Sequence, residues 1–441
     1  MRTTTHLVRR GACAAALAIL AAGVASAPAL AATTSPTTLT PSDGVGGDLF
    51  GESTATSTTG AVTVVGSPEH NSAGAAYVFT GTSQTAELAP SNPQADEQFG
   101  QTVAISGDGE TLVAAAPGAA GTSGSDQGAA YVFSDTSGTW TQIAELTVPG
   151  TAELGTSLAI STDASTIVLG APTTNDDAGE AVVFTLSGGT YVQTQVLTAS
   201  TSTTSTTSAA KVQTRTVSAV SAAKKLNPTP KPAPTPAPAP TVPVFLGTDT
   251  AISSNGSTIA FGEPQNGTTV VFTKAAGAST WTQTAQLNGG GDSVAVSSNG
   301  EIVAAGQTGI NNLNGAVFVF TESGSTFTEA SEVLPPANTT NAAFAAGTNI
   351  GMSASGSIIA FGAPTATAGS AFESGEVFVA TETKTGTWKL TATDAEPNPV
   401  SDDDLGGGDQ SVSVAGNGTA IVAGARAANG QTGQAIVFPV S

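Results

Sequence analysis

Cysteine and histidine, which supply many catalytic and metal-binding groups, are nearly missing from this chain of 441 residues, which has one cysteine and two histidines. Cys13 and His6 both lie within the first 31 residues, so the rest of the chain has no thiol and one imidazole, at His70. A disulfide framework, a thiolate metal site and a two-histidine metal site are therefore excluded outside that first segment. No Gly-x-Ser-x-Gly motif accompanies His70. We interpret it as an exposed loop residue, and we predict no catalytic and no cofactor-binding residue.

Basic residues and long apolar runs are also scarce. The chain has 12 lysine and arginine residues against 33 aspartate and glutamate residues, which gives a net charge of -21. Such an acidic surface repels phosphate groups, so we expect no nucleic acid partner. No apolar stretch of about 18 residues follows the first segment, so we also expect no membrane span.

The first 31 residues have the pattern of a signal peptide. Arg2, Arg9 and Arg10 form a basic start, residues 11–24 are rich in alanine and leucine, and the sequence ALA at residues 29–31 provides a cleavage site. We therefore predict a signal peptide over residues 1–31 and a protein that is secreted or displayed at the cell surface.

A pattern of two apolar runs separated by a short turn repeats along the chain. The clearest copy, FGQTVAISGDGETLVAAAP, spans residues 99–117. Each copy is followed by a second motif, such as GAAYVF at residues 128–133, and most by a third with an aromatic residue, such as GTWTQIAEL at residues 138–146. The seven copies lie at residues 49–68, 99–117, 154–172, 245–264, 291–307, 349–364 and 408–426.

Each unit of roughly 50 residues thus contains four short runs rich in β-forming residues. Four antiparallel strands per unit predict an all-β fold, a seven-bladed β-propeller of four-stranded antiparallel blades. Asn-Gly and Asp-Gly in the first turn of several units predict a two-residue hairpin loop with positive φ at both central positions. The seventh unit offers three strands, and the segment from Thr37 aligns with the fourth strand of the first unit at Thr85. We therefore predict that an N-terminal outer strand completes the last blade and closes the ring.

One segment of different composition interrupts the repeats. Residues 199–243 have no acidic residue, a serine and threonine tract, five positive charges and then alternating proline, which predicts a disordered insertion. It is a tolerated insertion, a spacer or glycosylated stalk, or a basic tether to an anionic cell-wall polymer. We assign residues 37–198 to the closing strand and blades 1–3, residues 199–243 to the insertion and residues 244–441 to blades 4–7.

The repeats resemble the FG-GAP repeats of the integrin α-subunit β-propeller and its bacterial relatives. The similarity rests on FG at residues 99–100 with AAP at residues 115–117, and on GAP at residues 170–172 and 362–364. Calcium-binding members of that family carry a long acidic loop, Asp-x-Asp/Asn-x-Asp-Gly-x-x-Asp, in the first hairpin of some blades. Here the same connection is as short as SGDGE at residues 106–110, so no calcium ligand is carried over and we expect no required cofactor.

Acidic residues gather instead in the sequence SDDDLGGGD, where Asp402, Asp403, Asp404 and Asp409 form a candidate cation cluster. Consecutive carboxylates rarely converge on one ion, so a solvated acidic loop is the alternative to a weak calcium site.

Strand parity gives the predicted propeller two unlike faces. The connections from strand 1 to strand 2 and from strand 3 to strand 4 share one face and are short, whereas the other connections share the second face and vary in length. Variable loops on a rigid ring are typical of recognition sites, so we expect a ligand site on the second face. We predict a monomeric, non-catalytic binding scaffold for a protein or glycan, and the family resemblance implies adhesion. The alternatives are a polysaccharide hydrolase that uses carboxylates on that face, and a structural cell-envelope protein.

Overall fold

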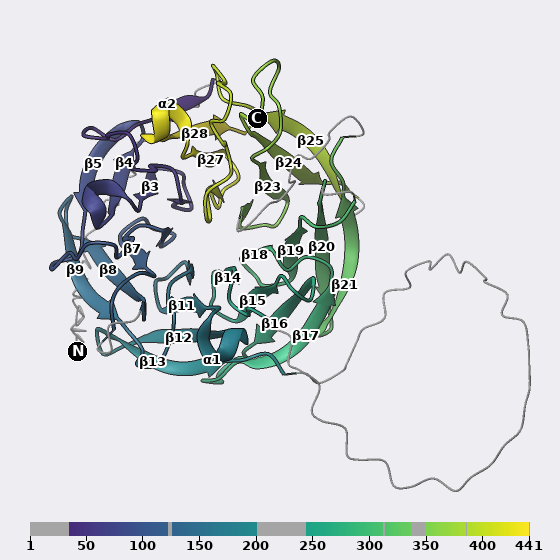
Figure 1. The fold of residues 1–441 in the computed structure, drawn as a ribbon. Coiled ribbons are helices and arrows are strands. Elements are labelled where there is room, and N and C mark those ends of the chain that lie inside the picture. Colours follow the sequence, from purple (N-terminus) through teal and green to yellow (C-terminus); the bar gives the residue numbers. More distant parts are fainter. Residues whose placement is uncertain are drawn as a thin grey trace, which may run out of the picture. The chain divides into compact units, whose positions relative to one another are not determined.

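The computed structural model describes residues 35–121, 126–200, 244–311, 314–336, 349–384 and 386–440. In this part of the chain, seven four-stranded antiparallel sheets follow one another around a ring, which confirms the prediction of an all-β seven-bladed propeller (Figure 1). The predicted signal peptide and residues 201–243 of the predicted insertion lie outside the described residues. The described helices are all too short to cross a membrane.

The four strands of blades 1–6 run from the innermost to the outermost in chain order. Blade 1 contains β2 (Thr54–Thr56), β3 (Val62–Ser67), β4 (Ala75–Thr80) and β5 (Ser83–Leu88), and blade 2 contains β6 (Thr102–Ile105), β7 (Thr111–Ala116), β8 (Ala129–Asp135) and β9 (Trp140–Leu146). Blade 3 contains β10 (Ser157–Ile160), β11 (Thr166–Ala171), β12 (Glu180–Ser187) and β13 (Thr190–Leu197), and blade 4 contains β14 (Thr250–Ile252), β15 (Thr258–Glu263), β16 (Thr268–Thr273) and β17 (Thr282–Asn288). Blade 5 contains β18 (Ser293–Val296), β19 (Ile302–Gln307), β20 (Ala316–Ser323) and β21 (Thr326–Val333), and blade 6 contains β22 (Ile350–Met352), β23 (Ile358–Ala363), β24 (Glu376–Glu382) and β25 (Trp388–Asp394).

Blade 7 takes its strands from two distant parts of the sequence. Its inner strands are β26 (Val412–Val414), β27 (Ala420–Ala425) and β28 (Gln434–Pro439), and its outer strand is β1 (Thr37–Leu39). The pairing of β1 with β28 is antiparallel and places Leu39 opposite Ala435. The prediction that an N-terminal strand closes the ring is therefore confirmed.

Glycines at the seams between blades explain the repeated FG and GAP motifs. In blade 3, a Cβ atom on Gly170 of the GAP motif would lie 2.1 Å from the carbonyl oxygen of Gly247 in blade 4. In blade 1, Gly74 before β4 forms a parallel bridge with Phe99, which begins the next unit. Neighbouring blades thus meet backbone to backbone at these points, and a side chain there would separate them.

The first hairpin turn differs from the predicted one. In blade 2, Ser106 donates its N–H to Thr111 and Gly109 donates its N–H to Ser106, and the five residues 106–110 connect the two strands. Gly109 has φ 80°, and it is the one residue of that turn with positive φ. The prediction of a two-residue loop with two such residues is therefore wrong. Ala164, with φ 56°, takes the equivalent position in blade 3.

Backbone hydrogen bonds join the seven first turns in a closed circle. The N–H of Thr58 donates to the carbonyl of Gly107 in the next blade, and Asn417 of blade 7 donates back to Thr58. The intervening donors are Gly107, Thr162, Ser254, Ser298 and Ala354. These turns therefore lie on one face of the ring, which we call the turn face.

The strand 3 to strand 4 connections share the turn face, because aromatic side chains beside them reach the first turns. The indole N–H groups of Trp281 and Trp388 donate to the carbonyls of Gly256 and Gly356 at 3.1 and 2.9 Å. This contact gives the aromatic residue of the third motif a structural role.

The remaining connections form the opposite face, which we call the loop face. The segments that lead into blades 1–5 and 7 bond to the strand 2 to strand 3 loop of the blade before, as when Asp402 donates its N–H to Phe372. The prediction of two unlike faces is confirmed. Short helical turns in the strand 2 to strand 3 loops are η1 (His70–Ser72), α1 (Thr174–Asp177) and α2 (Ala428–Gln431).

Candidate functional site

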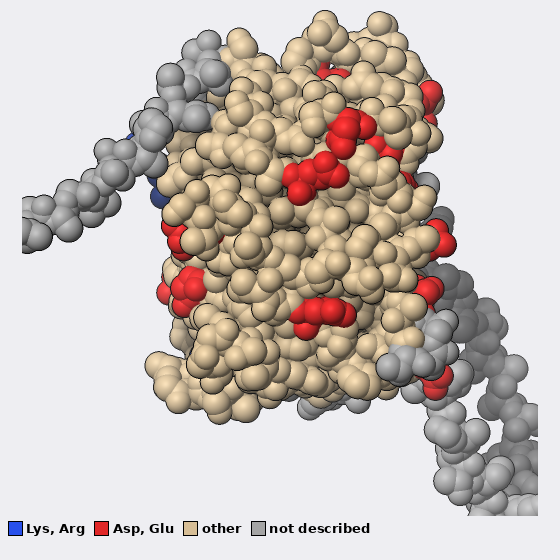
Figure 2. All heavy atoms as spheres, turned by 90° about the vertical axis from the view of Figure 1, so that its left-hand side faces the viewer, with Lys and Arg blue, Asp and Glu red and all other residues tan. Residues whose placement is uncertain are grey.

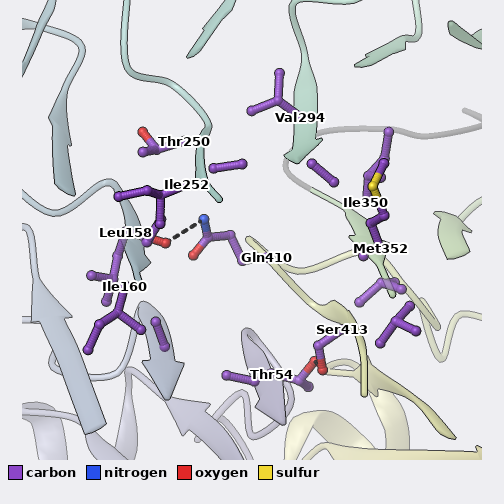
Figure 3. A pocket seen from close by; sticks show the side chains of 18 of the residues that line it. Thr54, Leu158, Ile160, Thr250, Ile252, Val294, Ile350, Met352, Gln410 and Ser413 are labelled. Carbon is purple, nitrogen blue, oxygen red and sulfur yellow. Dashed lines mark hydrogen bonds between the residues drawn. The ribbon is translucent and has the colours of Figure 1, made fainter. Parts of the chain in front are cut away.

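The inner strands of the seven blades surround a cavity of about 250 Å³ (Figure 3). Its wall is mostly alanine, valine, isoleucine and leucine. The side chain of Gln410 reaches across the cavity and donates to Leu158 and Asp249 at 3.1 and 3.2 Å. Asp249 also accepts the N–H groups of Thr250 and Val294, and burial raises its pKa to about 7. Because the cavity is small and its polar groups are paired, we assign it a structural role.

An ion-pair network lies on the loop face where blade 7 meets blade 1. Arg426 donates from Nη1 to both carboxylate oxygens of Glu52, at 2.9 and 3.0 Å, and from Nε to Asp404 at 2.9 Å. Asp409 accepts a hydrogen bond from Gln101 at 2.7 Å. Burial raises the pKa of Glu52, while the charge of Arg426 acts in the opposite direction. The guanidinium of Arg426 thus neutralises carboxylates from the first and the last parts of the propeller sequence.

The structure separates the four aspartates of the candidate cation cluster. Asp404 and Asp409 belong to the network just described. Asp403 is buried and accepts a backbone N–H of its own loop at 2.8 Å, whereas Asp402 is exposed. Among the described residues, these four carboxylates do not form a group of converging ligand atoms. Calcium binding by this loop stays a prediction.

A pocket of about 650 Å³ lies on the loop face beside blade 7, between its outer strand, its strand 2 to strand 3 loop and the segment that leads into the blade. We call it the seam pocket. Most of its wall is polar, and several of its amide side chains are exposed to solvent. Its lining residues are Thr38, Glu396, Pro397, Asn398, Val400, Ser401, Asp402, Asp403, Ala427, Asn429, Gly430, Gln431 and Gln434.

The seam pocket contains a buried carboxyl group at Glu396, which is 6% exposed. Gln434 donates to its Oε2 atom, while its Oε1 atom is buried without a well-formed hydrogen bond. Burial and the neighbouring Asp403 raise the pKa of Glu396 to about 7. A carboxyl group of this kind can donate a proton or a hydrogen bond at neutral pH.

Val400 lines the seam pocket, and Phe372 lies beside it in the strand 2 to strand 3 loop of blade 6. Phe372 and Val400 are 61% and 62% exposed, and the N–H of Phe372 donates to Ser401 Oγ at 3.1 Å. Exposed apolar side chains beside a polar pocket are a common feature of binding surfaces. No sequence motif identified Glu396 or Phe372 as functional residues, because both lie in loops whose composition differs from blade to blade.

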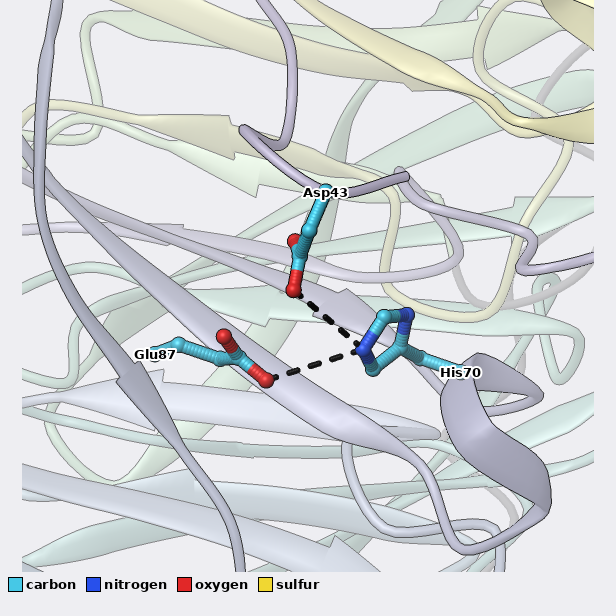
Figure 4. A group of neighbouring side chains, drawn as sticks. All are labelled: Asp43, His70 and Glu87. Carbon is cyan, nitrogen blue, oxygen red and sulfur yellow. Dashed lines mark ion pairs between the residues drawn. The ribbon is translucent and has the colours of Figure 1, made fainter. Parts of the chain in front are cut away.

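His70 is placed differently from the sequence interpretation. It is 4% exposed and lies at the start of η1, so the interpretation as an exposed loop residue is wrong. Its Nδ1 atom lies 2.9 Å from Asp48, and its Nε2 atom lies 3.6 Å from both Asp43 and Glu87 (Figure 4). Asp43 and Asp48 come from the segment between β1 and β2, which packs against the strand 2 to strand 3 loop of blade 1. The pairing of distant segments, which the repeat pattern does not reveal, buries this histidine.

The surface is acidic but not uniformly so. Figure 2 shows one side of the molecule, on which aspartate and glutamate side chains form separate red patches among uncharged residues. A ligand of this surface can therefore bind through hydrogen bonds and hydrophobic contacts as well as through charge.

Comparisons with known proteins agree with this architecture. Residues 34–79 and 82–133 match the FG-GAP repeat family. A comparison with curated proteins finds no match. Similar solved structures include the β-propeller domain of Cps50 (Swd1) from Myceliophteria thermophila, with 9% identity, a TM-score of 0.54, and coverage of 92% of this chain and 100% of that chain.

Two further solved structures are similar at comparable levels. The hydrazine synthase of Kuenenia stuttgartiensis has 11% identity and a TM-score of 0.53, with coverage of 88% of this chain and 95% of that chain. A protein described as a putative 6-phosphogluconolactonase from Bacteroides uniformis has 13% identity and a TM-score of 0.51, with coverage of 82% and 87%. Likeness at these identities concerns the fold alone. Residues 34–133 therefore carry FG-GAP repeats, and the chain folds as a seven-bladed β-propeller.

Proposed function

We propose that this protein is a non-catalytic binding scaffold whose loop face recognises a glycan or protein ligand outside the cell. The observation that carries the proposal is the seam pocket, whose polar wall includes the exposed side chain of Val400 and lies beside the exposed residue Phe372. The pattern of residues 1–31 supports export, and the resemblance to integrin propellers supports a role in adhesion.

The chemistry of the seam pocket favours a carbohydrate segment. Asn398, Asn429 and Gln431 are exposed there and offer both hydrogen-bond donors and acceptors, which suits hydroxyl groups. The buried carboxyl group of Glu396 adds one more polar group, and Phe372 offers an exposed aromatic side chain in the loop that bonds to Ser401 of the pocket wall. A neutral sugar can use all of these groups, whereas an anionic ligand would be repelled by Asp402 and Asp403.

A glycan array probed with the full exported chain tests this proposal. We expect binding to a restricted set of neutral glycans, and we expect F372A and N398A to weaken it by at least tenfold. I143A is the matched control, because Ile143 is 52% exposed on β9 of blade 2, away from the seam pocket. Equal binding by wild type and F372A would refute the role of the pocket. Capture of a protein but no glycan would redirect the proposal to a protein ligand, and a negative result with both would favour a structural envelope protein.

A polysaccharide hydrolase is the second candidate, because Glu396 and Asp403 are neighbouring carboxyl groups on the loop face. Asp403 is close enough to raise the pKa of Glu396, however, whereas the two carboxyl groups of a glycosidase stand about 5 Å or more apart. Incubation with a panel of polysaccharides distinguishes the two functions. Reducing ends that appear with wild type and disappear with E396Q would establish hydrolysis, whereas binding without turnover would establish the scaffold.

A further inference from the structure

A histidine and two carboxylates converge where the N-terminal segment meets blade 1. Nε2 of His70, Oδ2 of Asp43 and Oε1 of Glu87 all lie within 4.8 Å of one another (Figure 4). The three residues come from three different elements: η1, the segment between β1 and β2, and β5. We propose that these side chains form a binding site for one divalent transition metal ion, of which Zn²⁺ is the best fit. We call this group the His70 site.

The distances suit a metal better than direct hydrogen bonds. Both contacts from the imidazole Nε2 to a carboxylate oxygen are 3.6 Å long, which exceeds the range of about 2.7–3.2 Å for a hydrogen bond. Zinc bonds to nitrogen and oxygen are about 2.0–2.2 Å long, so two ligands of a tetrahedral zinc lie roughly 3.3–3.5 Å apart. The His70 site is therefore close to the spacing that the ion requires.

A buried carboxylate orients the imidazole for metal binding. The carboxylate of Asp48 lies 2.9 Å from Nδ1 of His70, and both side chains are about 4% exposed. Because an ionised carboxylate can only accept a hydrogen bond, the proton is on Nδ1 and the lone pair is on Nε2, which faces the other two carboxylates. Metal-binding histidines in proteins commonly have such a carboxylate partner. The amide of Asn71, 2.7 Å from Nε2, belongs to an exposed side chain that the ion can displace.

The charge of the His70 site also calls for a cation. Three carboxylates surround one imidazole, and the ion pairs found among the described residues bring no lysine or arginine to them. The hydroxyl of Tyr77 donates to Oδ1 of Asp43 at 3.0 Å, which leaves Oδ2 directed at the imidazole. The side chains of Asp43 and Glu87 are 44% and 39% exposed, so an ion can enter from solvent and keep a water molecule as its fourth ligand.

The His70 site belongs to one blade and is not a general feature of the repeat. In blade 2, Glu145 lies opposite Tyr131, as Glu87 lies opposite Tyr77 in blade 1. The chain has no second histidine outside its first 31 residues, so blade 2 offers the carboxylate without the imidazole. Because Asp43 precedes β2 and follows β1, a bound ion would tie the closing segment of the ring to blade 1.

Titration calorimetry of the full exported chain with ZnCl₂, after dialysis against a chelator, tests the site. We expect one ion per chain with a dissociation constant in the micromolar range, and a rise in Tm when zinc is added. H70Q and D43N should weaken binding at least tenfold, and D48N should weaken it by about 10- to 100-fold through loss of the orienting hydrogen bond. E145Q should bind as wild type does.

The exposed position of Asp43 makes D43N the variant that tests the ligand set without disturbing the core. Replacement of zinc by Co²⁺ gives a second readout, a visible absorption band that should be lost in H70Q. No heat and no shift in Tm with zinc would overturn the proposal and leave His70 as a buried residue held by its contacts with Asp48 and Asn71. Binding of zinc that persists in both H70Q and D43N would also overturn it, because the ion would then be held by other acidic groups. These outcomes do not depend on glycan binding at the seam pocket.

Discussion

Replacement of Leu39 by alanine tests whether the N-terminal strand is an integral part of the ring. Leu39 is the last residue of β1 and is 1% exposed. It packs in a cluster that includes Phe50 of the FG motif and Tyr77 and Phe79 of β4. A side chain buried to this degree loses its transfer free energy on truncation and leaves a cavity between blades 7 and 1.

The expected cost of L39A is about 3 kcal/mol, within the range of about 2–5 kcal/mol for buried leucines. Unfolding entropy of about 2.1 cal/mol/K per residue, over a ring of roughly 350 residues, converts this into a fall in Tm of about 4 °C. Leu146 ends β9 as Leu39 ends β1, and it is 3% exposed within blade 2. L146A is therefore the matched control, because all four strands of blade 2 come from one continuous stretch of the chain. We expect the same loss of stability from both variants.

Tryptophan fluorescence during thermal and urea unfolding measures both variants, because Trp281 and Trp388 are 2% and 4% exposed in the folded state. A cost below about 1 kcal/mol for L39A, together with about 3 kcal/mol for L146A, would refute the reasoning. Such a result would mean that β1 leaves the edge of blade 7 without loss of the ring. A loss of stability in L39A that is accompanied by a lower m-value would instead show that the ring opens before it unfolds.

Two further predictions concern pH and the first hairpin turns. The pKa of Glu396 is raised from 4.5 to about 7 in the folded state, so its contribution to stability is full below about pH 4.5 and is lost as the pH rises through about 7. Between pH 5 and pH 8, the free energy of unfolding measured in urea should therefore fall by about 1–2 kcal/mol more for wild type than for E396Q. The same pH dependence in both proteins would contradict the raised pKa of Glu396. For the turns, G109A should cost about 1 kcal/mol, because φ is 80° there and the added Cβ would lie 3.0 Å from Val62, whereas A164G should be near neutral. Equal thermal stability of G109A and wild type would contradict this account of the turn.

The architecture of the ring could be predicted from the sequence because it depends on contacts that recur in every blade. The glycine of the GAP motif lies against the backbone of the next blade, as Gly170 lies against Gly247. Because this contact leaves no space for a side chain, glycine recurs wherever the contact occurs. The outer strand that closes blade 7 was predicted for a similar reason, since the segment from Thr37 aligns with the fourth strand of blade 1 at Thr85. Both signals arise from packing between neighbours, which repeats with the units.

The first hairpin turn was predicted less well, because Asn-Gly and Asp-Gly are compatible with more than one loop. The pair is common in two-residue turns, but a longer loop with one left-handed residue uses the same glycine. Hydrogen bonds between turns of neighbouring blades, such as that from Thr58 to Gly107, select the longer loop. This tertiary contact cannot be read from one hairpin alone.

The candidate sites could not be predicted, and the way in which the blades are joined explains why. Contacts such as those of Gly170 and Gly74 hold the blades backbone to backbone, so the loops above them can change without moving the strands. Glu396, Phe372 and His70 therefore lie in segments that the repeat does not constrain. His70 is buried by residues more than twenty positions earlier, across the seam that joins the two ends of the ring. Because the loops can vary while the strands keep their positions, a binding site can form at any one of the contacts between neighbouring blades.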